Sequence, residues 1–266
     1  MPGLLVPAVR LRPPIGSRTA RCAGPHARVL CAPARQGLVA CRRTGARPVP
    51  QLSAGRDETL ANAKAIVQAT HLPVAADLEN GFGQAPEKAA ETIRLAIGVG
   101  LAGGSIEDAS GDSAKPIYDF NLAVERIAAV VEAVRAQDIP FVLAARAENF
   151  LHGRTDLDDT IKRLQAFEKA GADVLYAPGL PSLKAIKEVC SAVSRPVNVL
   201  ADPALTLKQL EDASVKRVSV GSALNLSALA AFAKSAHEIK DFGTFNFAKD
   251  ALPFGEINKL MKEEPR

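Results

Sequence analysis

The chain has no long hydrophobic run, and its first segment has no acidic residue. Although 47% of the residues are hydrophobic, no run approaches the ~20 apolar residues that a membrane-spanning helix needs, so we expect no membrane partner. Residues 1–56 contain ten Arg but no Lys, Asp or Glu. The whole chain carries a net charge of +4, so residues 57–266 carry −6. The basic charge therefore belongs to the first segment, and we expect no nucleic-acid surface on the remainder.

Cysteine is scarce, and its spacing argues against two common uses. Cys22, Cys31 and Cys41 lie in the first segment, where they form no Cys-x-x-Cys metal motif. Their odd number does not suggest a disulfide framework. Cys190 falls in the helical pattern of residues 183–193, where we expect a buried structural thiol rather than a catalytic one.

The first segment, residues 1–55, shows neither the alternation of a strand nor the period of a helix, and we predict that it is irregular or disordered. Three interpretations stay open. An organellar transit peptide is Arg-rich and acid-poor, but it is also Ser-rich and amphipathic, which this segment is not. A disordered tail fits the composition. An out-of-frame translation of GC-rich DNA would also be rich in Arg, Pro, Ala, Gly and Cys.

From residue 56 onward, short apolar runs alternate with amphipathic segments of helical period. The pattern predicts six strands, each followed by a helix, and one helix before the first strand. Such alternation implies a parallel sheet. The predicted strands are residues 73–78, 103–106, 141–145, 173–176, 196–200 and 217–221, and the predicted helices are residues 57–70 (capped by Asp57), 86–99, 119–137, 157–170, 183–193, 205–213 and 223–239.

Two architectures place ligands at the carboxyl ends of parallel strands, the barrel and the doubly wound sheet. No Gly-x-Gly-x-x-Gly follows the first predicted strand, and Asn80–Gly83 is too short for a phosphate-binding loop. We therefore predict an α/β fold of the (β/α)8 TIM-type barrel over residues 56–240. It would lack an ordered first strand, first helix and second strand. Residues 241–266 are predicted to form a C-terminal helical extension.

Polar residues gather where these strands end, beginning with Asp77 and Glu79. Residues two apart in a strand point to the same side, so the two carboxylates should converge and repel unless a cation or a proton lies between them. Oxygen ligands suit Mg²⁺, so this is a candidate magnesium site. Gly81 would let the backbone turn and approach a ligand.

The next strands add further charged and polar groups in the same place, namely Glu107, Asp108, Arg146, Glu148 and Asn198. Because neighbouring strands lie ~4.8 Å apart, their ends could share one pocket. A metal could neutralise the acids and polarise a substrate oxygen, and an arginine could bind a carboxylate or phosphonate bidentately. Each acid taken alone could instead cap a helix or a loop.

Several of these segments together resemble the phosphoenolpyruvate mutase/isocitrate lyase superfamily, in the branch of carboxyvinyl-carboxyphosphonate phosphorylmutase and oxaloacetate decarboxylase. The similarity begins near Arg56 and runs to the C-terminus. The segments that carry it are Ala76-Asp77-Leu78-Glu79-Asn80-Gly81-Phe82-Gly83, Gly104-Ser105-Ile106-Glu107-Asp108, Ala145-Arg146-Ala147-Glu148, Ala170-Gly171-Ala172-Asp173, Pro196-Val197-Asn198 and Arg217-Val218-Ser219-Val220-Gly221.

The resemblance implies a Mg²⁺-dependent lyase or isomerase that cleaves or rearranges a C–C or P–C bond. The substrate would be a small anionic α-oxo or 2-hydroxy acid, and the reaction would pass through an enolate-like state. Asp77 would match the main metal-anchoring aspartate, while Glu79 and Glu107 would act largely through bound water. Arg146 would clamp the substrate, so Arg146 and Glu107 are the expected catalytic residues. Asn198 and Gly81, with Arg146, are the expected substrate contacts.

The resemblance also implies a cytoplasmic homo-oligomer, commonly a tetramer with an exchanged C-terminal helix, in which residues 242–262 could be the intersubunit element.

The chain also departs from the family pattern. No Lys-Lys-Cys-Gly-His loop is present, and residues 109–118 do not reproduce the gating loop of the mutases. The family's Asn-Pro-Trp-Asp first strand and its Ser-Ala-Gly-type second turn are missing from residues 1–56. We therefore expect weak or no activity. The alternative function is a catalytically impaired barrel remnant that binds metal or carboxylate without turnover.

Overall fold

The computed structural model describes residues 6–7, 9–10, 30–32 and 54–262, with side chains for residues 54–259. The chain divides into two compact units, residues 1–222 and residues 223–266. Within the described residues, no helix combines the length and the apolar character that crossing a membrane requires.

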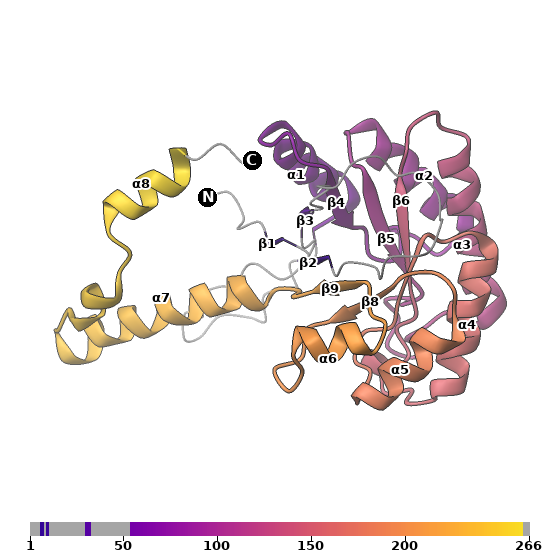
Figure 1. The fold of residues 1–266 in the computed structure, drawn as a ribbon. Helices are drawn as coiled ribbons and strands as arrows, with labels where there is room; N and C mark the ends of the chain where they lie inside the picture. Colours follow the sequence, from indigo (N-terminus) through magenta and orange to yellow (C-terminus); the bar gives the residue numbers. More distant parts are fainter. Residues whose placement is uncertain (1–5, 8, 11–29, 33–53, 263–266) are drawn as a thin grey trace. The chain divides into compact units, whose positions relative to one another are not determined.

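The first unit is built on a curled sheet whose central strands are parallel and follow the sequence order (Figure 1). This arrangement is an α/β fold with a partial TIM-type barrel, as the alternation predicted. The six strands predicted from sequence are all present, at bounds close to the expected ones. They are β4 (Val74–Asp77), β5 (Gly103–Glu107), β6 (Val142–Arg146), β7 (Val174–Tyr176), β8 (Val197–Leu200) and β9 (Arg217–Ser219).

Three further strands lie within the segment for which irregular structure was predicted. β3 (Leu30–Ala32) pairs in parallel with β4, and β1 (Val6–Pro7) pairs antiparallel with β3. β2 (Val9–Arg10) pairs antiparallel with β9 at the other edge of the sheet. Sequence analysis missed these pairings because two or three residues are too few to show a period. The remainder of residues 1–55 lies almost wholly outside the described residues.

Since β1 and β2 are separated by one residue in the sequence yet pair with opposite edges of the sheet, the two edges must approach each other. The sheet therefore curls toward closure.

Helices cover the outside of this sheet, and α2, α3 and α4 follow one another around it (Figure 1). Short capping residues fix several of the starts: Asp156, Ser182 and Thr206 each accept a hydrogen bond from a main-chain N–H three residues on. The helices of the first unit are α1 (Arg56–Gln68), α2 (Pro86–Gly98), α3 (Phe120–Arg135), α4 (Leu157–Ala170), α5 (Leu183–Ala192) and α6 (Leu207–Asp212).

One predicted cap was wrong. Helix α1 is capped by Gly55 without a side-chain hydrogen bond, and Asp57 lies inside its first turn. A carboxylate in the first turn still interacts favourably with the helix dipole, which explains why the sequence pattern suggested a cap there.

The hydrophobic core lies between the sheet and the helices. Its fully buried members include Leu78, Ile93, Ile106, Leu143 and Phe167. Toward the carboxyl end of β5, the polar Ser105 and Glu107 flank the buried Ile106 and so lie on the face of the sheet opposite to this core. The interior of the curled sheet is therefore available to the charged residues described below.

The second unit contains α7 (Ala223–Phe242), the 3-10 helix η2 (Asn246–Asp250) and α8 (Phe254–Lys262). The helices predicted at residues 223–239 and within 242–262 are therefore present. None of the described residues of α7 is buried. It stays a prediction that α7 completes the barrel to residue 240. It also stays a prediction that the following residues form an extension to the barrel.

Candidate functional site

Strand register brings the predicted site residues of β5 to β8 into one row. Glu107 pairs with Arg146, Arg146 with Tyr176, and Tyr176 with Asn198. Side chains at paired positions of neighbouring strands point to the same face of a sheet. Asp77 lies beside Ser105 in the row below. Five neighbouring strands, β4 to β8, therefore present polar groups to a shared region toward the carboxyl edge of the sheet.

The guanidinium of Arg146 lies among three carboxylates. Its Nη2 is 3.0 Å from Oε2 of Glu107, and its Nε is 2.8 Å from Oε1 of Glu148. Its Nη1 contacts Oδ2 of Asp77. The side chain of Arg146 is only 12% exposed and that of Glu148 only 3% exposed, so these charges are largely removed from water. The structure brings Asp77, Glu107 and Arg146 together in one place, as their positions at the strand ends predicted.

Negative charge exceeds positive charge in this cluster, and the pKa values reflect the imbalance. Burial raises the pKa of Glu107 to about 8, since Arg146 only partly offsets the cost of burying its charge, while Glu148, Asp77 and Glu79 repel it. Burial also raises the pKa of Glu148. Burial opposes the charge on Arg146, but the three carboxylates outweigh that effect and hold its pKa above the ordinary value. A further cation or a proton would relieve this imbalance.

The segment after β4 has an unusual backbone. Glu79 adopts φ +54° and Gly81 adopts φ +77°. A Cβ on Gly81 would lie 2.7 Å from the Cα of Ala89 in α2, so close packing against this helix demands glycine. That contact is structural, and a substrate contact by Gly81 stays a prediction. The main-chain carbonyl of Glu79 accepts a hydrogen bond from the Glu107 N–H at 3.0 Å, which ties this segment to the end of β5.

Asn198 is buried in the interior of the curled sheet. Its Nδ2 donates to Oγ of Ser219 at 3.0 Å, whereas its Oδ1 has no hydrogen-bond partner among the described residues. A buried, unpaired acceptor is costly, so this oxygen is available to a ligand donor. The role of Asn198 in substrate binding is consistent with this environment and stays a prediction.

Sequence analysis missed Tyr176. The ring of Tyr176 lies beside the Arg146 guanidinium, with 5.3 Å between Cζ and the ring centroid, a cation–π geometry. Burial raises the pKa of its hydroxyl. Its place at the end of β7, in register with Arg146, was the available signal. A tyrosine at a strand end carries no charge, so its residue type alone gives no sign of a role in the cluster.

Asp108 lies beside the cluster and has a structural partner. Its Oδ2 is 2.9 Å from Nη1 of Arg163 in α4, and its Oδ1 accepts from the Glu148 N–H at 2.8 Å. Burial raises the pKa of Asp108, although the Glu148 N–H and Arg163 counteract this. This residue therefore supports the end of β6 instead of joining the cluster around Arg146.

The carboxylates provide the hard oxygen donors that Mg²⁺ prefers, and the excess negative charge favours a cation. Among the described residues, however, no three His, Cys, Asp or Glu side chains converge closely enough to form a complete metal cage. Arg146 lies between Asp77 and Glu107. The residues thus fit a metal held by one direct carboxylate with the others acting through water, which is the arrangement the resemblance implies.

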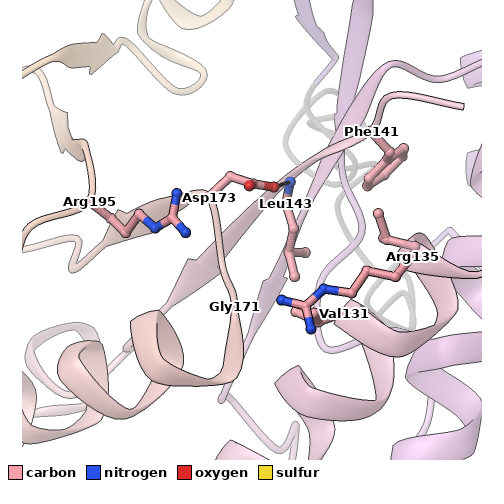
Figure 2. Close-up of a pocket in the computed structure, with 8 residues that line it drawn as sticks. Val131, Arg135, Phe141, Leu143, Gly171, Asp173 and Arg195 are labelled. Atoms are coloured by element: carbon pink, nitrogen blue, oxygen red, sulfur yellow. Dashed lines mark hydrogen bonds between the residues drawn. The ribbon is translucent and has the colours of Figure 1, made fainter. Parts of the chain in front are cut away.

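A cavity of about 160 Å³ lies elsewhere in the first unit. Figure 2 shows it between the end of α3 and the starts of β6 and β7, with the Asp173 carboxylate beside the Leu143 nitrogen, from which it accepts a hydrogen bond at 2.9 Å. Barrel enzymes bind their ligands at the opposite, carboxyl ends of the strands. We therefore place the candidate site at the Arg146 cluster and not at this cavity.

A curled parallel sheet with charged groups at its carboxyl edge defines a protein of the α/β barrel class. Residues 46–240 match the sequence profile described as phosphoenolpyruvate phosphomutase. The chain belongs to the phosphoenolpyruvate mutase/isocitrate lyase superfamily, which confirms the resemblance found in the sequence.

Known relatives support this membership. A crystal structure from Burkholderia cenocepacia J2315, classed only as a lyase/mutase, is 52% identical with a TM-score of 0.76, covering 79% of this chain and 77% of that chain. The 2-methylisocitrate lyase of Escherichia coli strain K12 is 31% identical over 60% of this chain and 56% of its own length. The oxaloacetate decarboxylase of Paraburkholderia xenovorans strain LB400 is 30% identical over 73% of this chain and 64% of its own length. The chain thus matches less than two thirds of the length of each of these two relatives.

Proposed function

We propose that this protein is a Mg²⁺-dependent lyase or mutase that cleaves or rearranges a C–C or P–C bond in a small α-oxo or 2-hydroxy acid. The observation that carries the proposal is the Arg146 guanidinium held among Asp77, Glu107 and Glu148 at the ends of neighbouring parallel strands. Relatives named 2-methylisocitrate lyase and oxaloacetate decarboxylase act on acids of this class.

Arg146 would bind the substrate carboxylate. A bidentate contact uses two guanidinium N–H groups in parallel, and in the structure these groups are engaged by the acids around it. A guanidinium has five N–H donors, so Arg146 can bind a substrate carboxylate through the donors that these ion pairs leave or by exchanging a contact with Asp77 or Glu107. A carboxylate released by such an exchange is free to face a cation.

Asp77, with Glu79 and Glu107 through water, would hold Mg²⁺. The bound ion would supply Lewis-acid stabilisation of negative charge that develops on the substrate oxygen. Glu107 has a pKa of about 8 without a cation, so at neutral pH it can hold a proton within the cluster. Asn198 Oδ1 and Gly81 complete the proposed substrate contacts, and Arg146 stabilises developing enolate charge electrostatically.

The purified full chain should be tested with oxaloacetate, 2-methylisocitrate and phosphonopyruvate, with and without Mg²⁺. Release of pyruvate from oxaloacetate or 2-methylisocitrate, or conversion of phosphonopyruvate to its isomer phosphoenolpyruvate, would support the proposal if it requires Mg²⁺ and is lost in Arg146→Met. Mg²⁺-independent turnover, or turnover unaffected by Arg146→Met, would refute the proposed site.

The second candidate is a barrel remnant that binds metal and carboxylate without turnover. The missing Asn-Pro-Trp-Asp and Ser-Ala-Gly-type motifs in residues 1–56 favour it. Calorimetry distinguishes the two candidates, since the remnant would bind oxalate in a Mg²⁺-dependent manner while converting none of the three acids.

A homo-oligomer, either dimer or tetramer, is part of the same proposal. Phe242 and Phe254 in the second unit are 76% and 86% exposed, which is unusual for large apolar side chains and suits an intersubunit role for residues 242–262. Light scattering on the full chain should therefore give a mass at least twice the 28.0 kDa of one chain. A monomer at micromolar concentration would contradict this assignment. The cytoplasmic location stays a prediction.

A further inference from the structure

Arg126 of α3 is among the largest fully buried side chains, at 1% exposure, yet no carboxylate pairs with it among the described residues. Its Nη1 donates to the main-chain carbonyl of Gly83 at 2.7 Å and to that of Gln84. Its Nη2 donates to the carbonyl of Asn80. A buried cation usually requires an anionic partner, so a cation whose hydrogen bonds all go to backbone carbonyls, with its Nε left without a partner among the described residues, needs an explanation.

The segment that Arg126 contacts is the one that follows the two acids of β4. Glu79 and Phe82 adopt φ +54° and +58°, and Gly81 between them adopts φ +77°. A left-handed backbone is unfavourable for residues with a Cβ, and it persists only where the surroundings enforce it. Arg126 binds carbonyls on both sides of Gly81 and Phe82, and so restrains the turn from both ends.

A second contact joins Arg126 to the same segment. Its guanidinium lies over the Tyr118 ring, with 4.4 Å between Cζ and the ring centroid. The Tyr118 hydroxyl accepts a hydrogen bond from Asn80 Nδ2 at 3.2 Å. The contacts therefore form a ring around the turn, from Arg126 to Tyr118, from Tyr118 to Asn80 and from Asn80 back to Arg126. Two of these residues, Arg126 and Tyr118, lie outside the turn.

We propose that Arg126 is a positioning residue: it holds residues 79–85 in their left-handed turn and thereby keeps Glu79 directed at the site. The inference rests on the proposed function, since Glu79 is one of the proposed metal ligands. Arg126 itself would touch neither metal nor substrate. Its effect would reach the site through the Glu79 main chain, which is also bonded to the Glu107 N–H.

The test compares the wild-type chain with Arg126→Met, Arg126→Lys and a control, Arg135→Met, which removes an exposed arginine from the same helix. Two quantities are measured, the Kd for Mn²⁺ by electron paramagnetic resonance and amide hydrogen exchange without metal. The informative amides are Glu79, Gly81 and Phe82, which all donate hydrogen bonds within the turn.

We expect Arg126→Met to accelerate exchange at these amides at least tenfold and to raise the Mn²⁺ Kd at least tenfold. Exchange in α4 should stay unchanged. Arg126→Lys, which keeps the charge and part of the hydrogen bonding, should give intermediate values, and Arg135→Met should match the wild type.

Three results would overturn the inference. Exchange at the turn within twofold of the Arg135→Met control would show that Arg126 does not hold it. Acceleration spread equally over α4 would show a general role in stability. Faster exchange at the turn with an unchanged Mn²⁺ Kd would show that the turn does not position a ligand. If the wild type binds no Mn²⁺, the proposed function fails, and the positioning of a metal ligand fails with it. The exchange data would still decide whether Arg126 orders the turn.

Discussion

Two largely buried arginines, Arg146 at the end of β6 and Arg163 in α4, have different electrostatic surroundings. Arg163 contacts Asp108 and Asp159; Asp108 also accepts a hydrogen bond from the Glu148 N–H, and Asp159 accepts one from Asn149 Nδ2. Arg146 contacts three acids, and a fourth, Glu79, lies near enough to raise the pKa of Glu107.

The difference separates a structural ion pair from a site. Around Arg163 burial raises the pKa of Asp108, counteracted by the Glu148 N–H and Arg163, and the pKa of Asp159 is lowered by Arg163 and Asn149 despite partial burial. Around Arg146 the excess of carboxylates raises the pKa of Glu107 to about 8. Unsatisfied charge in a partly enclosed region is typical of functional sites.

The largest effect should come from removing each arginine. Arg163→Met leaves Asp108 buried without its cation, and breaking such a pair costs ~3–5 kcal/mol. Urea unfolding should show this loss in the free energy of unfolding. The folded variant should still bind oxalate in the presence of Mn²⁺ with an affinity within about threefold of wild type. Arg146→Met should instead weaken oxalate binding at least ~100-fold, since a charged hydrogen-bonded contact is worth ~3 kcal/mol. Equal loss of oxalate affinity in both variants would contradict the contrast.

A smaller effect should separate the acids of the two clusters. The Asp77 side chain is 35% exposed and shares Arg146 with two other carboxylates, so Asp77→Asn should change the free energy of unfolding by less than about 1 kcal/mol. The same variant should weaken Mn²⁺ binding at least ~100-fold, because a neutral amide is a poor ligand for a hard cation.

Asp108→Asn is the matched control. It should cost ~1–3 kcal/mol of stability through a damaged buried hydrogen-bond pair and leave the Mn²⁺ Kd within threefold of wild type. The assignment of Asp77 as the metal anchor would be wrong if Asp108→Asn weakened Mn²⁺ binding as much as Asp77→Asn.

Much of the central fold could be predicted from the sequence, because strands β4–β9 and the helices between them have clear periods and clear ends. The gathering of Asp77, Glu107 and Arg146 was also predictable, since acids and an arginine at the ends of successive parallel strands must meet at one edge of the sheet. Their roles as metal ligands and catalytic groups stay predictions.

Other features depend on tertiary structure. Arg146 on β6 reaches Asp77 across β5, and only the length of an arginine side chain allows this. Arg126 lies within the helix predicted at residues 119–137, where the pattern marks its apolar neighbours as inward and gives no sign that a charged residue is buried too. Its partners are backbone carbonyls of residues 80–85, which carry no signal in the residue types.

The smallest effect should appear as a pH dependence. The pKa of Glu107 is raised from 4.5 to about 8 by burial, so the folded metal-free protein binds more protons than the unfolded chain between these pH values. Its stability should therefore fall as pH rises through this range, and Glu148, whose pKa is also raised by burial, contributes in the same direction. Glu107→Gln removes one titrating group and should flatten the fall by at least about 1 kcal/mol between pH 5 and pH 8, since one pKa unit corresponds to ~1.4 kcal/mol.

Urea unfolding at a series of pH values measures this slope, with Glu58→Gln, an exposed position on α1, as the control. Saturating Mg²⁺ should flatten the wild-type slope in the same way, because a bound cation offsets the buried negative charge that otherwise draws a proton. The Arg163 cluster should respond less, because burial raises the pKa of Asp108 while Arg163 and Asn149 hold the pKa of Asp159 below its ordinary value. A Glu107→Gln variant with the wild-type slope would mean that the excess charge around Arg146 is relieved by something other than protonation of this residue.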